Sequence, residues 1–202
     1  MKKLFVPLLL AAAAGLASAA AVVGQPAPAF TATDTSGKTV SLADYKGKHV
    51  VLEWVNPGCP FVQKHYSSAN MQATQKAATG KGVVWLTINS TATDAGDYKA
   101  PGEMAAWMQQ QKAAASATLM DADGKVGRAY GARTTPHMYI VDPAGKLVYA
   151  GAIDSRPTAN PAHVKDATNH VNAALAEALA GKPVTTASTQ PYGCSIKYAN
   201  GA

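Results

Sequence analysis

Cysteine is scarce in this sequence, because 202 residues contain only Cys59 and Cys194. Small secreted proteins that depend on a disulfide framework carry several pairs, so that class of protein is excluded. The hydrophobic core must therefore supply most of the stability. The two sulfur atoms raise a question of chemistry, since one pair of cysteines can act in redox reactions or serve as a single structural bridge.

Long hydrophobic runs and basic clusters are scarce as well. Beyond the N-terminal segment, no apolar stretch reaches the roughly 20 residues that a membrane-spanning helix needs. The formal charge is +6, from 18 Lys and Arg residues against 12 Asp and Glu residues, and the charges are spread singly along the chain. A nucleic-acid-binding protein concentrates its basic residues on one face. We therefore expect neither a membrane span nor a nucleic-acid partner.

The N-terminal segment is typical of a secretory signal peptide. Lys2 and Lys3 precede an apolar, Ala-rich run, and Ala17-Ser18-Ala19 forms a small-x-small cleavage site. We predict a signal peptide over residues 1–19 and export to the bacterial periplasm or the extracellular space. Removal of the two lysines lowers the formal charge from +6 to +4.

The rest of the chain alternates between strand and helix patterns. Apolar runs and period-two alternation predict strands at 30–33, 38–42, 50–55, 82–89, 117–120, 138–141 and 147–151. Helical spacing and capping residues predict helices at 60–79, 101–111, 126–130 and 160–179. This order implies one α/β domain over residues 20–182, with a mixed central sheet flanked by helices on both faces. An extended, mostly polar tail follows over residues 183–202 and carries Cys194.

Cys59 occupies the most informative position in the chain. It follows the apolar run Val50-Val51-Leu52 and precedes a helical pattern that starts at Pro60. A thiol at a helix N-terminus faces free backbone N–H groups and the positive end of the helix dipole, which favour the reactive thiolate. We therefore take Cys59 as the candidate nucleophile.

Several motifs around this cysteine resemble one known group of proteins. The segment Gly24-Gln25-Pro26-Ala27-Pro28-Ala29-Phe30, the pattern Leu42-x-x-Tyr45-x-Gly47-Lys48, Trp54, Cys59 and Thr135-Pro136 follow one another as in the redoxins. These are thioredoxin-like proteins that include the alkyl hydroperoxide reductase and thiol-specific antioxidant family. The resemblance covers roughly residues 22–180 and implies a thioredoxin-like fold.

The resemblance also implies roles for two further residues. Thioredoxin folds place a cis-proline loop beside the active cysteine, and Pro136 occupies the matching position. A buried acid stands six residues before the first thioredoxin cysteine and helps to move protons, which matches Glu53 here. Burial would raise the pKa of Glu53 toward neutrality, as that task needs. An ordinary loop proline, and a glutamate that pairs with a lysine or faces water, are the simpler alternatives.

The sequence departs from its relatives in two ways. Thioredoxins carry a second cysteine three residues after the first, where this chain has Val62. Peroxiredoxins carry Thr or Ser three residues before the peroxidatic cysteine and proline four residues before that, whereas Asn56 and Leu52 stand at those positions before Cys59. Cys59 thus matches the first thioredoxin cysteine rather than the peroxidatic one.

Other polar residues are weaker candidates for function. His137 follows Pro136 and could approach Cys59, as a thiolate partner or as half of a metal site, although a structural role is the simpler interpretation. His65 is expected to be a surface or packing residue, and Arg133 a surface residue. Two soft ligands without fixed geometry are no metal signature, so we expect neither a metal nor a cofactor.

The residues favour one function and leave two others open. The first is a secreted thiol-based oxidoreductase in which Cys59 attacks, Cys194 resolves, Pro136 shapes the groove and Glu53 assists proton transfer. Its partners would be a thiol or disulfide protein or a small-molecule oxidant. The second is a peroxiredoxin-type hydroperoxide reductase with an antioxidant role that uses the same cysteines. The third is a non-catalytic binding domain with a permanent bridge.

In each case we expect an intramolecular disulfide between Cys59 and Cys194 in the oxidised protein. An exported chain with two cysteines has only this internal pairing, and the tail is long enough to reach most of a small domain. The loop that the bond closes exceeds 100 residues. Closure of such a loop stabilises the fold by roughly 4–5 kcal/mol in the chain-entropy view.

Overall fold

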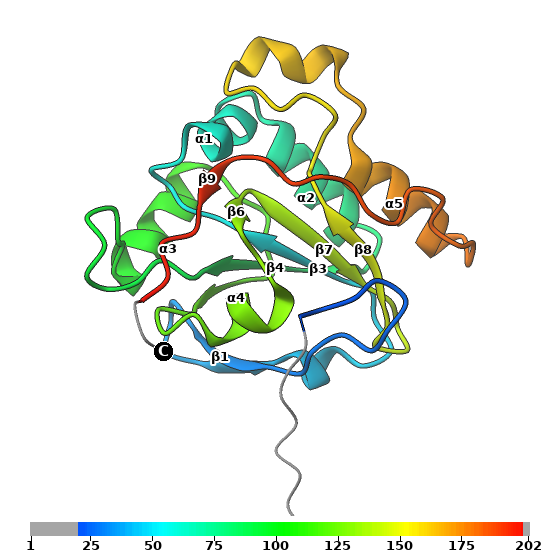
Figure 1. Cartoon of the computed structure of the whole chain (residues 1–202), viewed down its shortest axis with the longest axis horizontal. Coiled ribbons are helices and arrows are strands. Elements are labelled where there is room, and N and C mark those ends of the chain that lie inside the picture. Colours follow the sequence, from blue (N-terminus) through cyan, green and yellow to red (C-terminus); the bar gives the residue numbers. More distant parts are fainter. Residues whose placement is uncertain (1–19, 200–202) are drawn as a thin grey trace, which may run out of the picture.

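The computed structural model describes residues 20–199, and the predicted signal peptide lies outside them. Seven strands form one mixed sheet in the order β2-β1-β5-β4-β3-β7-β8 (Figure 1). The central strands β3, β4 and β5 run parallel, and the neighbours on both sides are antiparallel. The strands are β1 (Thr31–Asp34), β2 (Thr39–Ser41), β3 (Val50–Trp54), β4 (Val84–Asn89), β5 (Ala117–Met120), β7 (His137–Val141) and β8 (Leu147–Gly151).

Helices cover both faces of this sheet, as the sequence predicts. One face packs against four helices, namely α1 (Pro60–Ser67), α2 (Asn70–Thr79), α3 (Pro101–Gln110) and α5 (His170–Leu179). The other face packs against α4 (Lys125–Tyr130), with the 3-10 helix η1 (Leu42–Tyr45) beside it. Side chains along β3 point alternately to the two faces of the sheet, so the sheet separates two hydrophobic clusters. Val51 belongs to the cluster on the α1 face, whereas Leu52 and Trp54 belong to the cluster on the α4 face.

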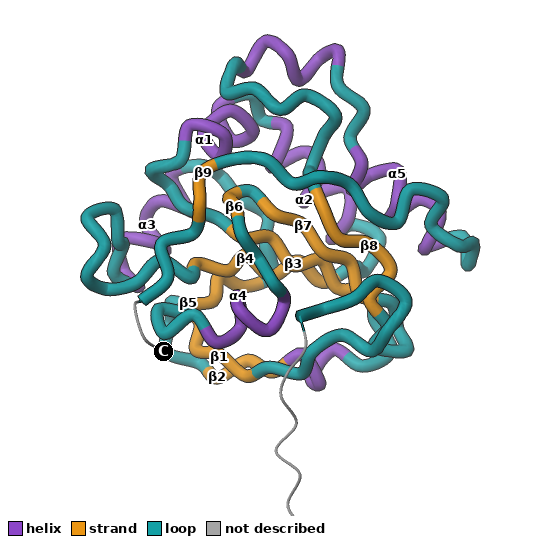
Figure 2. Tube along the Cα trace, viewed as in Figure 1, coloured by secondary structure: helices purple, strands orange, loops and turns teal. Residues whose placement is uncertain are grey.

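The C-terminal segment crosses the front of the domain (Figures 1 and 2). It begins after α5 and includes β9 (Cys194–Ser195), which pairs antiparallel with β6 (Thr134–Thr135). Thr135 lies opposite Cys194 in this register. The segment that the sequence predicts as a polar tail is therefore packed onto the domain over the part that the structure describes.

Two of the predicted helices are each divided in the structure. The predicted helix over 60–79 is two helices, because Ala69 adopts a left-handed backbone conformation with φ 58° between α1 and α2. The predicted helix over 160–179 is a 3-10 helix, η2 (Pro161–Asp166), followed by α5. The backbone is extended at Ala167, and Asn169 caps α5 by accepting a hydrogen bond from the Asn172 backbone N–H. The periodicity of apolar residues continues across both breaks, so it did not reveal them.

No helix within residues 20–199 is long and apolar enough to cross a bilayer.

The break at Ala69 generates a prediction about stability. A side chain at positive φ costs roughly 1–2 kcal/mol, and glycine removes that cost at a smaller entropic loss. Ala69→Gly should therefore raise the free energy of unfolding by about 0.5–1 kcal/mol. The matched change Ala73→Gly, at an exposed position inside α2, should lower it by about 1 kcal/mol. Urea unfolding of both variants tests the signs, and a loss of stability in Ala69→Gly would contradict the prediction.

Candidate functional site

Cys59 lies at the N-terminus of α1, as the sequence predicts. It is the N-cap residue, and Pro60 fills the first helical position, where the missing N–H costs nothing. The thiol donates a hydrogen bond to the carbonyl oxygen of Thr135 over 3.0 Å. Only 2% of the residue is exposed, so solvent scarcely reaches it in this conformation.

Asn56 shapes the turn that leads into Cys59. Its side-chain oxygen accepts a hydrogen bond of 2.7 Å from the Gly58 backbone N–H. Its amide nitrogen donates to Thr91 Oγ1 over 3.1 Å and to Asp97 Oδ2 over 2.9 Å. The position that carries a hydroxyl in peroxiredoxins is thus held by an amide whose groups are bonded to protein. Sequence reasoning noted Asn56 as a departure and missed this positioning role.

Cys194 lies against Cys59 although 135 positions separate them in the chain. Both thiols are free in the structure. Burial, the hydrogen bond with Cys59 and the charge on Cys59 together raise the pKa of Cys194 to about 12. The Thr135–Pro136 peptide bond is cis, in agreement with the expectation from the resemblance. Cys59, Pro136 and Cys194 therefore meet at one place, where β6, β9 and α1 converge.

Glu53 is fully buried beneath α1 and α2. Its carboxyl group accepts four hydrogen bonds, from Tyr66 (2.9 Å), Gln75 (3.1 Å), Trp85 (2.7 Å) and Thr87 (3.2 Å). Burial raises the pKa of Glu53, and these neutral donors offset only part of that shift. Glu53 thus neither pairs with a lysine nor faces water, the two alternatives to a buried acid.

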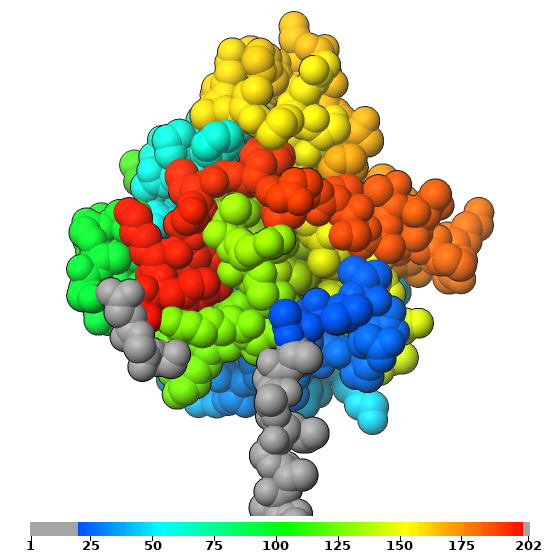
Figure 3. All heavy atoms as spheres, in the orientation of Figure 1, coloured from blue at the N-terminus to red at the C-terminus, as the bar shows by residue number. Residues whose placement is uncertain are grey.

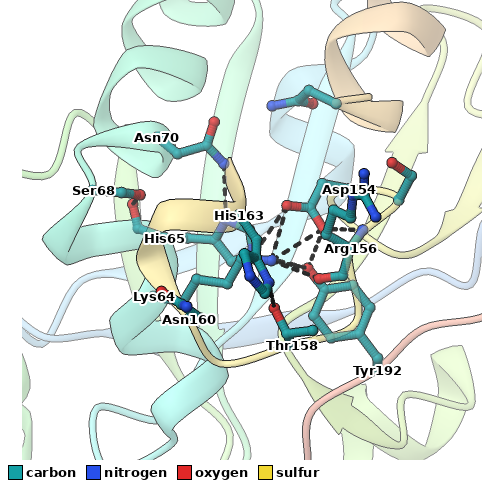
Figure 4. A network of polar contacts seen from close by, with 12 residues as sticks. Lys64, His65, Ser68, Asn70, Asp154, Arg156, Thr158, Asn160, His163 and Tyr192 are labelled. Atoms are coloured by element: carbon teal, nitrogen blue, oxygen red, sulfur yellow. Dashed lines mark hydrogen bonds and ion pairs between the residues drawn. The ribbon is translucent and has the colours of Figure 1, made fainter. Parts of the chain in front are cut away.

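A second buried polar cluster lies on α1, one turn beyond Cys59 (Figure 4). Lys64 is fully buried and forms an ion pair of 3.1 Å with Asp154. Lys64 Nζ also donates to the Arg156 carbonyl oxygen over 2.6 Å and to the Tyr192 hydroxyl over 3.2 Å. The Tyr192 hydroxyl in turn donates to Asp154. Because a buried charge must be paired, these contacts bind Tyr192, two residues before Cys194, to the helix that carries Cys59.

His65 completes this cluster in its neutral form. Asn70 donates a hydrogen bond of 2.8 Å to Nδ1, so Nε2 carries the proton and lies 3.0 Å from the Tyr192 hydroxyl. Burial lowers the pKa of His65 to about 4, although Asp154 opposes the shift. The expectation that His65 is a surface or packing residue missed its polar contacts. No local pattern could reveal them, because Lys64, Asp154 and Tyr192 are far apart in the sequence.

Further contacts fasten the C-terminal segment on both sides of Cys194. The ring of Tyr192 packs edge-on against Phe61 at 5.8 Å. Ile196 packs against the core cluster on the α4 face, and its backbone N–H donates to the Arg133 carbonyl oxygen over 3.0 Å. The Tyr198 hydroxyl donates to the Ala132 carbonyl oxygen over 2.8 Å. Cys194 is therefore positioned by anchors that precede it and follow it.

His137 lies on the face of the sheet opposite Cys59. It belongs to β7. Met138 and Ile140 of this strand belong to the hydrophobic core on the face covered by α1, whereas Tyr139 belongs to the core on the face covered by α4. Alternation therefore directs His137 to the same side as Tyr139, with which it makes a ring contact of 4.5 Å. The suggestion that His137 approaches Cys59 was wrong. Within the described residues, no group of three or more potential metal ligands occurs.

The neutral state of His65 generates a prediction about pH. Its pKa is about 4 in the folded protein and about 6.5 in the unfolded chain, so acid favours unfolding. The part of the free energy of unfolding that depends on neutral His65 is fully present above pH 6.5 and is lost as the pH falls toward 4. Between pH 6.5 and 4.5, wild type should lose about 1–2 kcal/mol more stability than His65→Gln.

Urea unfolding at several pH values measures this difference in slope, to which Glu53 and His137 contribute equally in both proteins. His163→Gln, at an exposed histidine, is the control and should keep the wild-type slope. A His65→Gln protein with the wild-type slope would show that His65 is not held neutral.

Comparison with known proteins identifies the family of this chain. A family model described as the AhpC/TSA family matches residues 23–150. The thiol-disulfide oxidoreductase ResA of Bacillus thuringiensis is 25% identical over 134 residues, which cover 62% of this chain and 67% of ResA.

Two solved structures show the same fold. A hypothetical protein from Sinorhizobium meliloti 1021 superposes with a TM-score of 0.78 at 28% identity and covers 91% of this chain and 98% of its own. The thioredoxin domain of a thiol-disulfide oxidoreductase from Bacteroides vulgatus has a TM-score of 0.52 at 26% identity, over 72% of this chain and 96% of its own. The fold is thioredoxin-like, as predicted, and the chain belongs to the AhpC/TSA family.

Proposed function

We propose that this protein is a thiol-disulfide oxidoreductase whose reactive pair is Cys59 and Cys194. The observation that carries the proposal is the packing of the C-terminal segment, which sets Cys194 against a thiol at the N-terminus of α1. The likeness to relatives named thiol-disulfide oxidoreductases supports it. Val62 stands where thioredoxins have their second cysteine and is fully buried, so the tail would supply the second sulfur.

The proposed reaction has two exchange steps. The Cys59 thiolate attacks one sulfur of a substrate disulfide, forms a mixed disulfide and releases the other substrate sulfur as a thiol after it takes up a proton. Cys194, as a thiolate, then attacks the Cys59 sulfur and releases the second substrate thiol. The substrate gains two electrons and two protons, and the enzyme is left with a Cys59–Cys194 disulfide.

Electrostatics would set the order of these steps. Negative charge on Cys59 raises the pKa of Cys194, so the two thiols resist simultaneous ionisation. Formation of the mixed disulfide would remove that charge, and opening of the tail would remove the burial that raises the pKa of Cys194 most, so both changes favour its ionisation. Glu53 is the candidate acceptor for the proton, because its raised pKa lies closer to neutrality than that of an exposed glutamate. The described partners of its carboxyl group are Tyr66, Gln75, Trp85 and Thr87, and neither thiol is among them. Proton transfer between Glu53 and a thiol would therefore need a water molecule between them.

Access to Cys59 would require the tail to move. Cys59 is 2% exposed, and β9 pairs with Thr134–Thr135 beside it. Only two residue pairs form this ladder, so its opening is local and leaves the seven-stranded sheet intact. In the open form, the free backbone of β6 and Pro136 would line a groove for a protein disulfide or a small-molecule oxidant. We thus treat residues 183–199, the described part of the predicted tail, as a lid that opens on the domain over residues 20–182.

Export is part of the same proposal, because disulfide chemistry of this kind suits an oxidising compartment. The motif Ala17-Ser18-Ala19 supports cleavage of a signal peptide. Protein from the exported fraction should therefore begin near Ala20, and the site would be the bacterial periplasm or the extracellular space. N-terminal sequencing measures this, and an intact Met1 on exported protein would contradict it.

Substitution of each cysteine tests the reaction. Cys59→Ser should lower turnover of a small-molecule disulfide by a factor on the order of 10³ or more, because it removes the nucleophile. In the Cys194→Ser variant, Cys59 should still attack the substrate disulfide, but the mixed disulfide on Cys59 should accumulate. Mass spectrometry detects this species. Peptide mapping of oxidised wild type should recover the Cys59–Cys194 linkage. Both thiols free after oxidation, or only intermolecular dimers through Cys194, would refute the pairing.

Two further measurements distinguish the alternative functions. Reduction of hydrogen peroxide that depends on Cys59, with kcat/KM of roughly 10⁶ M⁻¹s⁻¹ or more, would indicate a hydroperoxide reductase. We expect much slower turnover, because Asn56 is bonded to protein where that class has a hydroxyl. A disulfide midpoint potential below about −300 mV, without turnover, would indicate a structural bridge.

A further inference from the structure

A cavity of about 710 Å³ lies on the α4 face of the sheet, away from Cys59. Its walls come from five parts of the chain that the structure brings together, namely the N-terminal residues Ala20 and Ala21, the end of α4 with the loop that follows, β7, β8, and the C-terminal segment. Figure 3 views this face, with the N-terminal residues in blue, α4 in green and the C-terminal segment in red. A cavity of this volume can hold a small organic molecule.

The charged residues that line the cavity are all basic. Arg128 and Arg133 lie in its wall, and no Asp or Glu does. Within residues 20–199, neither arginine forms an ion pair. Arg128 donates hydrogen bonds to the carbonyl oxygens of Asp123 (2.8 Å) and Ala199 (2.6 Å) and lies over the Tyr198 ring at 4.7 Å, so all of these partners are uncharged. The cavity therefore has a positive potential that favours an anion.

His137 supplies a hydrogen-bond donor to the same cavity. It lines the wall and is only 5% exposed. Its Nδ1 accepts a hydrogen bond of 3.3 Å from the Arg133 backbone N–H, so the proton of the neutral ring is on Nε2. Burial and the charge of Arg133 lower the pKa of His137 to about 3, which keeps the ring neutral. Within residues 20–199, Nε2 makes no hydrogen bond, and it is not one of the fully buried polar atoms without a partner, so its N–H can be reached from the cavity.

We propose that this cavity binds a small anionic molecule through its carboxylate or phosphate group. Arg133 and Arg128 supply the positive charge, and His137 Nε2 donates a hydrogen bond to an oxygen of the anion. Guanidinium groups match the geometry of both anions, so the two ligand classes share one recognition chemistry.

Such a ligand would also stabilise the closed position of the C-terminal segment. Gln190, Pro191 and Tyr198 form part of the cavity wall on either side of Cys194. A ligand that contacts a wall binds more tightly when the wall is in place, and by linkage it favours that position. The anion would thus hold Cys194 beside Cys59. This regulatory consequence rests on the proposed function, whereas anion binding does not.

Calorimetric titration with succinate and with inorganic phosphate, at low ionic strength, tests the site. The mature chain with Cys59→Ser serves as the parent protein, so that redox chemistry and disulfide formation have no influence on the result. At least one anion should bind with a Kd of about 1 mM or tighter. Arg133→Gln should weaken that binding about tenfold, as expected for the loss of a charged hydrogen bond. The anion that binds identifies the ligand class as carboxylate or phosphate.

Arg156→Gln is the matched control, because this arginine is exposed, lies outside the cavity and makes the same change in net charge. It should change the Kd by less than about twofold. Absence of binding by both anions, or equal weakening by Arg133→Gln and Arg156→Gln, would overturn the site.

A second variant of the same parent protein tests the link to the tail. Tyr192→Phe removes the hydroxyl that anchors the segment to Lys64 and Asp154. Neither of these two residues, nor Tyr192 itself, lines the cavity. Anion binding should weaken in this variant, because the wall is in place for a smaller fraction of the time. An unchanged Kd would overturn the coupling between the cavity and the tail.

Discussion

The pairing of Cys194–Ser195 with Thr134–Thr135 is the contact on which the rest of the site depends. It brings the second sulfur to the N-terminus of α1, buries Cys59 and closes one wall of the basic cavity. Two residue pairs alone form a weak ladder. The flanking anchors therefore decide its stability, with Tyr192 bound into the buried cluster on α1 and Tyr198 bound to the Ala132 carbonyl oxygen.

The carboxyl groups of Asp154 and Glu53 are both buried, but their different surroundings suit them to different tasks. Asp154 lies beside the Lys64 ammonium group, and a charge that is paired and hydrogen-bonded can remain buried. Glu53 has only neutral donors, so burial raises its pKa and favours the protonated form. The first arrangement holds the C-terminal segment in place. In the second, burial holds the pKa of the Glu53 carboxyl group above that of an exposed glutamate, as its proposed role in proton transfer requires.

The separation of the two cysteines changes what a redox reaction does to the protein. In a local Cys-x-x-Cys motif, oxidation joins two residues on one helix turn and moves little else. Here the bond would join α1 to a segment 135 residues away, so oxidation would lock the lid and reduction would leave it able to open. The basic cavity borders that same lid. Its occupancy and the redox state would therefore act on one equilibrium, between docked and released tail.

The sequence by itself determined the layered α/β fold and the place of Cys59, because hydrophobic periodicity and the strand-to-helix turn are local properties of the chain. Resemblance added the cis conformation at Pro136 and the burial of Glu53. The break at Ala69, the orientation of His137 and the Lys64–Asp154–Tyr192 cluster were decided only by tertiary structure. Each of them depends on residues far apart in sequence or on one backbone angle, and packing selects these only when the whole core forms.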